Sequence, residues 1–275
     1  MKAIKVFSAS LGMVCAALLA TPASAQQSYN FANGGNCNFP PATCSVTGSA
    51  TVADTLSISA WGAAAGANFT AATITDQSSS GIGIDSDGNT APNHAVDNVG
   101  RLETVLLNFE NNKVVLTGLA AGWFQTDSDV AILRWTGADT GPNMANVNDF
   151  RGKTEAQLVS AGWTLMSTRD LDYNDGSSPY TKSTGIAETA ANASSWWLVS
   201  AYFGLAGSNT GLGVDNTAND YFKLQSVSAK CFGATHGGAC NSEPPSNGTP
   251  EPATLALVGL ALAGASLSRR KQRKG

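Results

Sequence analysis

Three stretches rich in Asp and Asn have the residue types that bind a hard metal ion. The segment Asp85-Ser86-Asp87-Gly88-Asn89 sets three Asp and Asn side chains around a glycine turn, and Asp127 and Asp129 form a second acidic stretch. Carboxylate and amide oxygens are the ligands that Ca²⁺ takes in proteins, and alternating spacing lets several of them converge. The candidate calcium ligands are therefore Asp85, Asp87, Asn89, Asp127 and Asp129.

None of these stretches completes an EF-hand. The first lacks a Glu at the twelfth position of the loop, and the third stretch, residues 170–176, has Thr181 where that Glu belongs. This third stretch contributes Asp170, Asp172, Asn174 and Asp175. The alternative for every stretch is an ordinary turn in which Asp and Asn side chains accept hydrogen bonds from nearby backbone amides.

The residues that usually catalyse hydrolysis are scarce. His94 and His236 are the two histidines, and no Gly-x-Ser-x-Gly segment occurs. A glycosidase needs only two carboxylates, and residues 26–249 contain 19 acidic side chains from which such a pair could come. We expect a protein that is not an enzyme, with a secreted glycoside hydrolase as an alternative.

Six tryptophans offer a second kind of binding chemistry, because an indole face can stack on a sugar ring. Trp196 and Trp197 are adjacent, so in a strand they point to opposite faces. Most of the six lie in apolar strand patterns and are expected in the core. A carbohydrate-binding module, with or without calcium, is the alternative. The six are Trp61, Trp123, Trp135, Trp163, Trp196 and Trp197.

Apolar alternation with a period of two predicts the strands that position these side chains. It predicts two strands within residues 45–60, one at 130–135 and one at 163–168. Residues 195–203 are apolar on both faces, which is typical of a central strand. We predict an all-β fold, a single β-sandwich for which a jelly-roll arrangement is one option.

Three local features complete this outline. Residues 104–109 and 113–119 flank Glu110-Asn111-Asn112 and predict a hairpin. Residues 220–231 predict the last strand, with a bulge where the apolar face changes. One short helix is predicted from Thr154, with Gly162 as its C-terminal cap.

Four cysteines remain once Cys15 is assigned to an N-terminal leader. An even number in an exported chain predicts two disulfides, and three pairings are possible. Local pairing joins Cys37 to Cys44 and Cys231 to Cys240, whereas the alternative pairings join the two ends of the domain.

Both ends of the chain have the composition of targeting segments. Lys2 and Lys5 precede an apolar stretch, and Ala23-Ser24-Ala25 has the small residues that signal peptidase requires. We therefore predict a signal peptide over residues 1–25 and a body domain over 26–242. A Pro-, Ser- and Gly-containing linker over 243–249 and a sorting segment over 250–275 follow it.

The C-terminal segment has three parts in a fixed order. Pro250-Glu251-Pro252 is followed by the apolar run 253–267, which as a helix just spans a thin bilayer. A basic end follows, and its cations favour the cytoplasmic side; it includes Arg269, Arg270 and Lys271. This arrangement resembles the PEP-CTERM sorting signal of Gram-negative bacteria.

The resemblance implies recognition by exosortase and cleavage near the Pro-Glu-Pro box, after export and transient anchoring in the inner membrane. Residues 92–98, together with Trp123 and residues 127–129, also resemble a pattern of exosortase-dependent surface proteins. That second resemblance implies the same location and no activity.

The net charge of the body domain and linker excludes one class of binding partner. Residues 26–249 carry nine basic and 19 acidic side chains, a formal charge of −10, which excludes a nucleic-acid partner because such binding requires cations. We expect a non-enzymatic protein of the cell surface or extracellular matrix, associated with exopolysaccharide and biofilm. Its expected partners are signal peptidase and exosortase during export, and exopolysaccharide afterwards.

Overall fold

Alternating apolar and small polar residues make most of the described chain β-strand. The computed structural model describes residues 26–32, 37–38, 43–47, 55–64, 67, 69–88, 94–110, 112–137, 161–172, 180–203, 214 and 219–234. The elements are β1 (Gln26–Asn30), β2 (Cys37–Asn38), β3 (Thr43–Thr47), β4 (Thr55–Ala64), β5 (Thr70–Asp76), η1 (Ser78–Ser80), β6 (Ile82–Asp85), β7 (Val96–Asp97), β8 (Arg101–Asn108), β9 (Asn112–Phe124), β10 (Asp129–Trp135), β11 (Trp163–Asp170), β12 (Thr181–Ser183), η2 (Ala190–Asn192), β13 (Trp196–Ala201) and β14 (Tyr221–Ala234).

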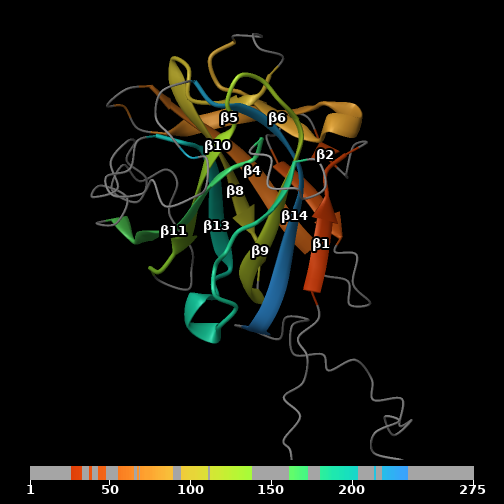
Figure 1. The fold of residues 1–275 in the computed structure, drawn as a ribbon, viewed down its shortest axis with the longest axis vertical. Coiled ribbons are helices and arrows are strands. Elements are labelled where there is room, and N and C mark those ends of the chain that lie inside the picture. The colour runs from red at the N-terminus through yellow and green to blue at the C-terminus, as the bar shows by residue number, and fades with distance from the viewer. Residues whose placement is uncertain are drawn as a thin grey trace, which may run out of the picture.

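The strands join into one nearly closed sheet (Figure 1). Its order is β11-β10-β13-β8-β4-β5-β6-β14-β9-β12, with β1 and β7 on β14 and β3 on β4. Strand β5 connects the two halves, because its first residues pair with β4 and its later residues with β6. The predicted all-β class is confirmed. The β-sandwich, with its jelly-roll option, is not confirmed, because β5 joins the two halves into one sheet.

The core lies between the two halves of this sheet. Among its largest fully buried side chains are Trp163, Trp197, Tyr29, Tyr202, Phe31, Phe109 and Phe222. Each such side chain contributes about 1.5–3 kcal/mol on burial. Tyr29 packs edge-on against Phe109, with ring centroids 5.4 Å apart, and thereby joins the first strand to the segment after β8.

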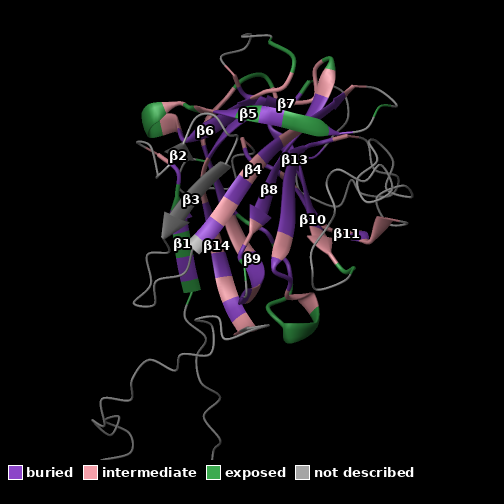
Figure 2. Ribbon diagram, turned by 180° about the vertical axis from the view of Figure 1, so that it is seen from behind, coloured by how far each residue is buried: buried purple, intermediate pink, exposed green. Residues whose placement is uncertain are grey.

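Strand β13 is central, as its sequence predicts. It pairs with β10 on one side and β8 on the other, and Figure 2 shows β8 and β13 buried along most of their length. Trp197 is fully buried and Trp196 only partly buried, so the adjacent indoles do take opposite faces.

The predicted hairpin of residues 104–119 is wrong. A turn does connect β8 to β9, with Asn112 N–H donating to Phe109 O at 3.0 Å and Glu110 at φ 52°. However, β8 pairs with β4 and β13, whereas β9 pairs with β14 and β12. The short turn is a corner between the two halves, because each strand has both edges occupied by partners far away in sequence.

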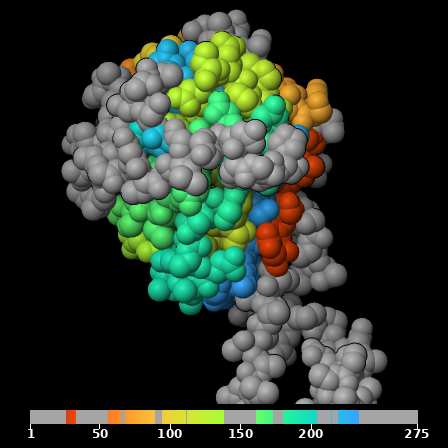
Figure 3. Space-filling view, in the orientation of Figure 1, coloured from red at the N-terminus to blue at the C-terminus, as the bar shows by residue number. Residues whose placement is uncertain are grey.

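Strand β14 is the central strand of the second half of the sheet. It pairs with β9 over most of its length and with β1, and β1 (red) lies against β14 (blue) in Figure 3. Its ladder with β9 shifts register at four places, one of them between Leu224 and Ser226. This confirms the predicted bulge in the last strand.

Several predictions fall on residues outside the described ranges. These are the signal peptide, the linker, the membrane helix at 253–267 and most of the helix before Gly162, which itself has φ 107°. Within the described residues, we find no helix with the length and apolar character needed to cross a membrane.

The cysteines are only partly described. The β2–β3 ladder sets Cys37 directly opposite Cys44, the neighbour that local pairing requires. Cys231 is disulfide-bonded, and Cys240 lies outside the described residues. The pairing of the four cysteines therefore stays a prediction.

Candidate metal centre

Strand ends bring five aspartates to one end of the sheet. Asp129 opens β10 and lies opposite Asp170, the last residue of β11. Asp127 forms a parallel bridge with Asp220, which immediately precedes β14. Asp172 follows β11 by two residues, so segments far apart in sequence contribute to one acidic cluster.

The carboxylates form two groups that share Asp127. Oxygen atoms of Asp127, Asp129 and Asp220 all lie within 4.8 Å of one another, and the same holds for Asp127, Asp170 and Asp172. Asp129 is 0%, Asp220 2% and Asp170 7% exposed. We call these five residues the aspartate cluster.

Hydrogen bonds fix the side chain of Asp220. Its Oδ1 accepts the backbone N–H of Asp129 at 2.9 Å, and its Oδ2 accepts Asn98 Nδ2 at 2.6 Å. The backbone N–H of Asp220 donates to Asn98 Oδ1 at 3.1 Å in return. Asn98 also donates to Tyr202 O at 2.8 Å, so it ties the segment after β7 to the ends of β13 and β14.

Shorter-range bonds hold two other members. Asp127 Oδ1 accepts the N–H of Ser128 at 2.9 Å, and Asp170 Oδ1 accepts the N–H of Asp172 at 2.9 Å. The carbonyl of Ser128 accepts the N–H of Leu171 at 3.2 Å, which joins the two acidic segments. These are the side-chain-to-backbone bonds of ordinary Asx turns, which were the alternative to a metal site in the sequence analysis. Here they also orient the carboxylates toward one place.

Negative charge accumulates in this buried end of the molecule. Burial, a hydrogen bond with Asp170 and the charges of Asp170 and Asp127 together raise the pKa of Asp172 to about 7. The ammonium group of Lys182 acts in the opposite direction. Carboxylates held this close in a low dielectric repel one another, and a bound cation or a proton relieves that repulsion.

The ligand atoms of the two groups indicate which class of metal ion they could bind. All ligands in the two groups are carboxylate oxygens, which suit Ca²⁺ or Mg²⁺ and not the softer metals that favour thiolate or imidazole. Ca²⁺ accepts six to eight oxygens in irregular geometry, whereas Mg²⁺ demands a near-ideal octahedron. A group built from strand ends and a turn matches the tolerance of Ca²⁺.

The predicted ligands separate in the structure. Asp127 and Asp129 belong to the aspartate cluster, while Asp85 and Asp87 lie in neither carboxylate group. Asp85 instead accepts the N–H of Gly88 at 2.7 Å and faces His94 Nδ1 at 4.0 Å, and Asn89 lies outside the described residues. Sequence reasoning named Asp170 and Asp172 as a similar stretch and missed Asp220, although Asp220 ends a further Asp- and Asn-rich segment with Asp215, Asn216 and Asn219.

A second buried acid, Glu103 of β8, joins the residue after β6 to strand β7. Its Oε1 accepts the N–H of Ser86 at 3.1 Å and its Oε2 the N–H of Asp97 at 3.2 Å. Burial, with the charges of Asp97 and Asp87, raises the pKa of Glu103 to about 9, although the bonds from Ser86 and Asp97 act in the opposite direction. Burial likewise raises the pKa of Asp97 to about 6.

The tryptophans take different environments. Trp163 and Trp197 are fully buried, and Trp197 donates to Val114 O and Ser194 O at 3.2 and 3.1 Å. Trp61, Trp123, Trp135 and Trp196 are partly buried, and Lys223 Nζ lies 4.8 Å from the centre of the Trp123 ring. Trp61 donates to Ser59 Oγ at 2.9 Å.

Comparison with known families gives one match, at the C-terminal end. Residues 249–272 match the model of the PEP-CTERM protein-sorting motif. The chain carries a PEP-CTERM sorting motif. This confirms the resemblance seen in Pro250-Glu251-Pro252 and the segment behind it. Neither the curated proteins nor the solved structures gave a match.

The PEP-CTERM motif implies an exported protein that exosortase processes. It also implies sorting through the C-terminus with a transient membrane anchor. The motif covers the tail alone, so what the β domain does has to be argued from its own residues.

Proposed function

We propose that this chain is a non-enzymatic protein of the cell surface or extracellular matrix whose β domain is stabilised by a calcium ion in the aspartate cluster. After export the domain associates with the exopolysaccharide of a biofilm. The PEP-CTERM motif supports the export step. The formal charge of −10 on residues 26–249 suits a hydrated matrix in which like-charged molecules repel.

The aspartate cluster is the observation that carries the proposal. Three of its five members are less than a tenth exposed, and carboxylate oxygens meet within 4.8 Å in both groups. Carboxylates held this close repel one another, so a cation that binds only the folded state stabilises that state. The ion would join β10, β11 and β14 at the end where Asn98 already joins β7 to β14.

Outside the cell, weak affinity is sufficient. Calcium sites of extracellular modules have dissociation constants of about 10⁻⁴–10⁻³ M. An ion at about 100 times its dissociation constant stabilises a fold by about 2.7 kcal/mol. We therefore expect the cluster to be filled in calcium-containing medium and emptied by a chelator.

Calcium titration of the full chain, purified in detergent, tests this proposal. We expect calorimetric heat from one site. We also expect a rise in the midpoint of thermal unfolding between EDTA and 5–10 mM CaCl₂ that corresponds to at most about 2.7 kcal/mol of added stability. Mg²⁺ at the same concentration is expected to give a smaller rise. Equal unfolding midpoints in EDTA and in calcium, with no binding heat, would refute the calcium part of the proposal.

Non-catalytic behaviour is expected for a specific reason. A general acid in a glycosidase needs a raised pKa, and Glu103, Asp97 and Asp172 have one. Both oxygens of Glu103 already accept backbone N–H groups, Asp97 accepts the N–H of Val99, and Asp172 belongs to the aspartate cluster. We expect no release of reducing ends from the host's own polysaccharide. Measurable release that Glu103→Gln abolishes would favour the secreted glycoside hydrolase instead.

A further inference from the structure

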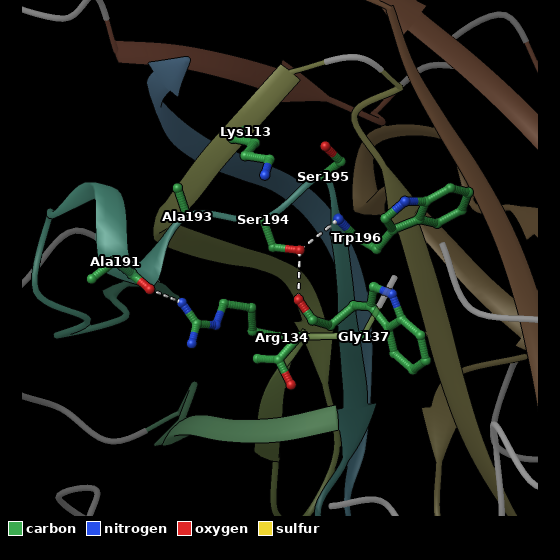
Figure 4. A pocket seen from close by; sticks show the side chains of 10 residues that line it. Lys113, Arg134, Gly137, Ala191, Ala193, Ser194, Ser195 and Trp196 are labelled. Carbon is green, nitrogen blue, oxygen red and sulfur yellow. Dashed lines mark hydrogen bonds between the residues drawn. The ribbon is translucent and has the colours of Figure 1, made fainter. Parts of the chain in front are cut away.

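A cationic, indole-lined pocket lies at the opposite end of β10 from the aspartate cluster. Asp129 opens β10 and Trp135 closes it, a distance of roughly 20 Å at ~3.3 Å per residue. The pocket has a volume of about 230 Å³ and lies between the start of β9, the end of β10, η2 and the start of β13 (Figure 4). Pockets for drug-sized ligands measure about 300–1,000 Å³, so this one is of the size for a single sugar ring.

Two cations line this pocket, although residues 26–249 carry a formal charge of −10. Arg134, from β10, donates a hydrogen bond through its Nη1 to Ala191 O of η2, which holds the guanidinium in place. Its Nε is buried and has no hydrogen-bond partner. Lys113, from the start of β9, contributes a second positive charge to the lining. Glu188, just before η2, is engaged by Lys230 at 2.9 Å.

Two indoles line the same pocket. Ser194 fixes their backbones, because its hydroxyl donates to Trp135 O at 2.9 Å and accepts the N–H of Trp196 at 3.1 Å. In Figure 4 the Trp196 side chain extends to one side of Ser194 and the guanidinium of Arg134 to the other. A ligand in this pocket therefore meets an aromatic surface and a cationic group together.

Glycines hold the Trp135 ring where it is. A Cβ on Gly137 would lie 2.1 Å from the indole and one on Gly162 would lie 2.8 Å from it. The ring also packs against Trp163, which is fully buried, at a centroid distance of 5.3 Å. The indole of Trp135 is thus immobilised before any ligand arrives, which lowers the entropy cost of binding.

We propose that this pocket binds a carboxylate-bearing sugar residue of an extracellular polysaccharide. Arg134 pairs with the carboxylate, because a guanidinium matches its two oxygens. The indole of Trp196 packs against the C–H face of the sugar ring, and Lys113 adds attraction for the anion. The ligand class rests on the proposed surface function, since only an exported domain meets such a polymer.

Binding of an oligogalacturonate trisaccharide to the full chain in detergent tests the proposal. We expect saturable binding by calorimetry with a change in tryptophan fluorescence, and at least tenfold weaker binding of the neutral galactose trisaccharide. Arg134→Gln and Trp196→Ala are each expected to lower affinity at least tenfold. Trp196→Phe, which keeps an aromatic face, is expected to retain most of the affinity.

Two control variants lie outside the pocket. Lys230→Gln removes a partly exposed cation of β14, and Trp123→Ala removes an indole that lies under Lys223. Both are expected to bind the charged trisaccharide as the unaltered chain does. Unchanged affinity in a folded Arg134→Gln variant, equal binding of both trisaccharides, or no binding of either would overturn the proposal.

The outcome is separable from that of the calcium proposal. Calcium stabilisation is measured on the aspartate cluster and trisaccharide binding on the pocket, and the two share no residue. Loss of trisaccharide binding with a normal calcium response would refute the pocket alone. Binding together with cleavage of the trisaccharide would support the pocket and contradict the non-enzymatic function.

Discussion

Asp127 belongs to both carboxylate groups, so the proposed metal centre depends on this side chain more than on any other. We expect Asp127→Asn to abolish most of the stabilisation by calcium. In EDTA the same variant should unfold at a slightly higher temperature than the unaltered chain, because one repelling charge is gone. Thermal unfolding in EDTA and in calcium measures both effects.

Asp87→Asn is the matched control for this prediction. Asp87 belongs to the first acidic stretch and lies outside both carboxylate groups. The calcium response of this variant should equal that of the unaltered chain. A response lost in Asp87→Asn and kept in Asp127→Asn would place the ion on the 85–89 loop.

Sequence alone could identify only part of this cluster. Asp127 and Asp129 are visible as a pair because they are close in the chain, and so are Asp170 and Asp172. The contribution of Asp220 depends on a bridge to Asp127 and on Asn98, which is 122 residues away. No local pattern records such contacts. The Asp- and Asn-rich segment 215–220 was the one signal that could have pointed to Asp220.

Glu103 gives the fold a pH dependence with a definite sign. Its pKa is about 9 in the folded protein against 4.5 as the ordinary value, so between these values the folded state holds a proton that the unfolded state lacks. Stability therefore falls as pH rises from about 5 to 9, by at most about 1.4 kcal/mol per pH unit.

Glu103→Gln tests this assignment. The amide can accept only one of the two backbone N–H bonds, so we expect a loss of about 1–3 kcal/mol at pH 5. The loss should shrink toward pH 8, because the variant has no proton to lose. Chemical unfolding at both pH values measures it, and a loss that grows with pH would contradict a raised pKa.

At the scale of elements, the alternation of apolar and polar residues predicted where the strands lie. It did not predict which strands pair with one another. Residues 195–203, apolar on both faces, gave the central strand β13 correctly. The 104–119 hairpin failed because a short turn between two apolar runs looks the same whether the strands pair or separate. The partners of β8 and β9 lie far away in sequence, which is the information that periodicity lacks.

Close packing of β6 against the segment before β7 gives a prediction at this scale. A Cβ on Gly83 would lie 1.5 Å from His94 O, so Gly83→Ala must push that segment away. Overpacking of this kind costs about 1–3 kcal/mol. Gly118→Ala in β9 is the control, since its nearest neighbour would be 3.4 Å away. Equal stabilities of the two variants in urea unfolding would contradict the packing described here.

At the scale of the whole molecule, the two ends of β10 differ in charge. The aspartate cluster lies at one end, and Lys113 and Arg134 lie at the other. This separation lets one acidic domain hold a cation and attract an anionic sugar without the two sites neutralising each other, because roughly 20 Å exceeds the ~8 Å screening length at physiological salt.

Disulfide pairing concerns the whole chain, and the register of the β2–β3 ladder favours one of the possible pairings. Cys37 and Cys44 are directly opposite each other, so we expect local pairing, with Cys231 joined to Cys240. Mass spectrometry of unreduced peptides should find these two pairs. A peptide that joins Cys37 or Cys44 to Cys231 would instead show that the bridges tie the two ends of the domain together.

The intact mass of the protein from host membranes and culture medium tests the central claim most directly. In cells with exosortase we expect a product that begins at Gln26 and lacks the residues after the Pro250-Glu251-Pro252 box. In cells without exosortase we expect the same start and a retained basic tail. A product from unaltered cells that keeps its tail through Gly275 would contradict the account and leave a tail-anchored protein of the inner membrane.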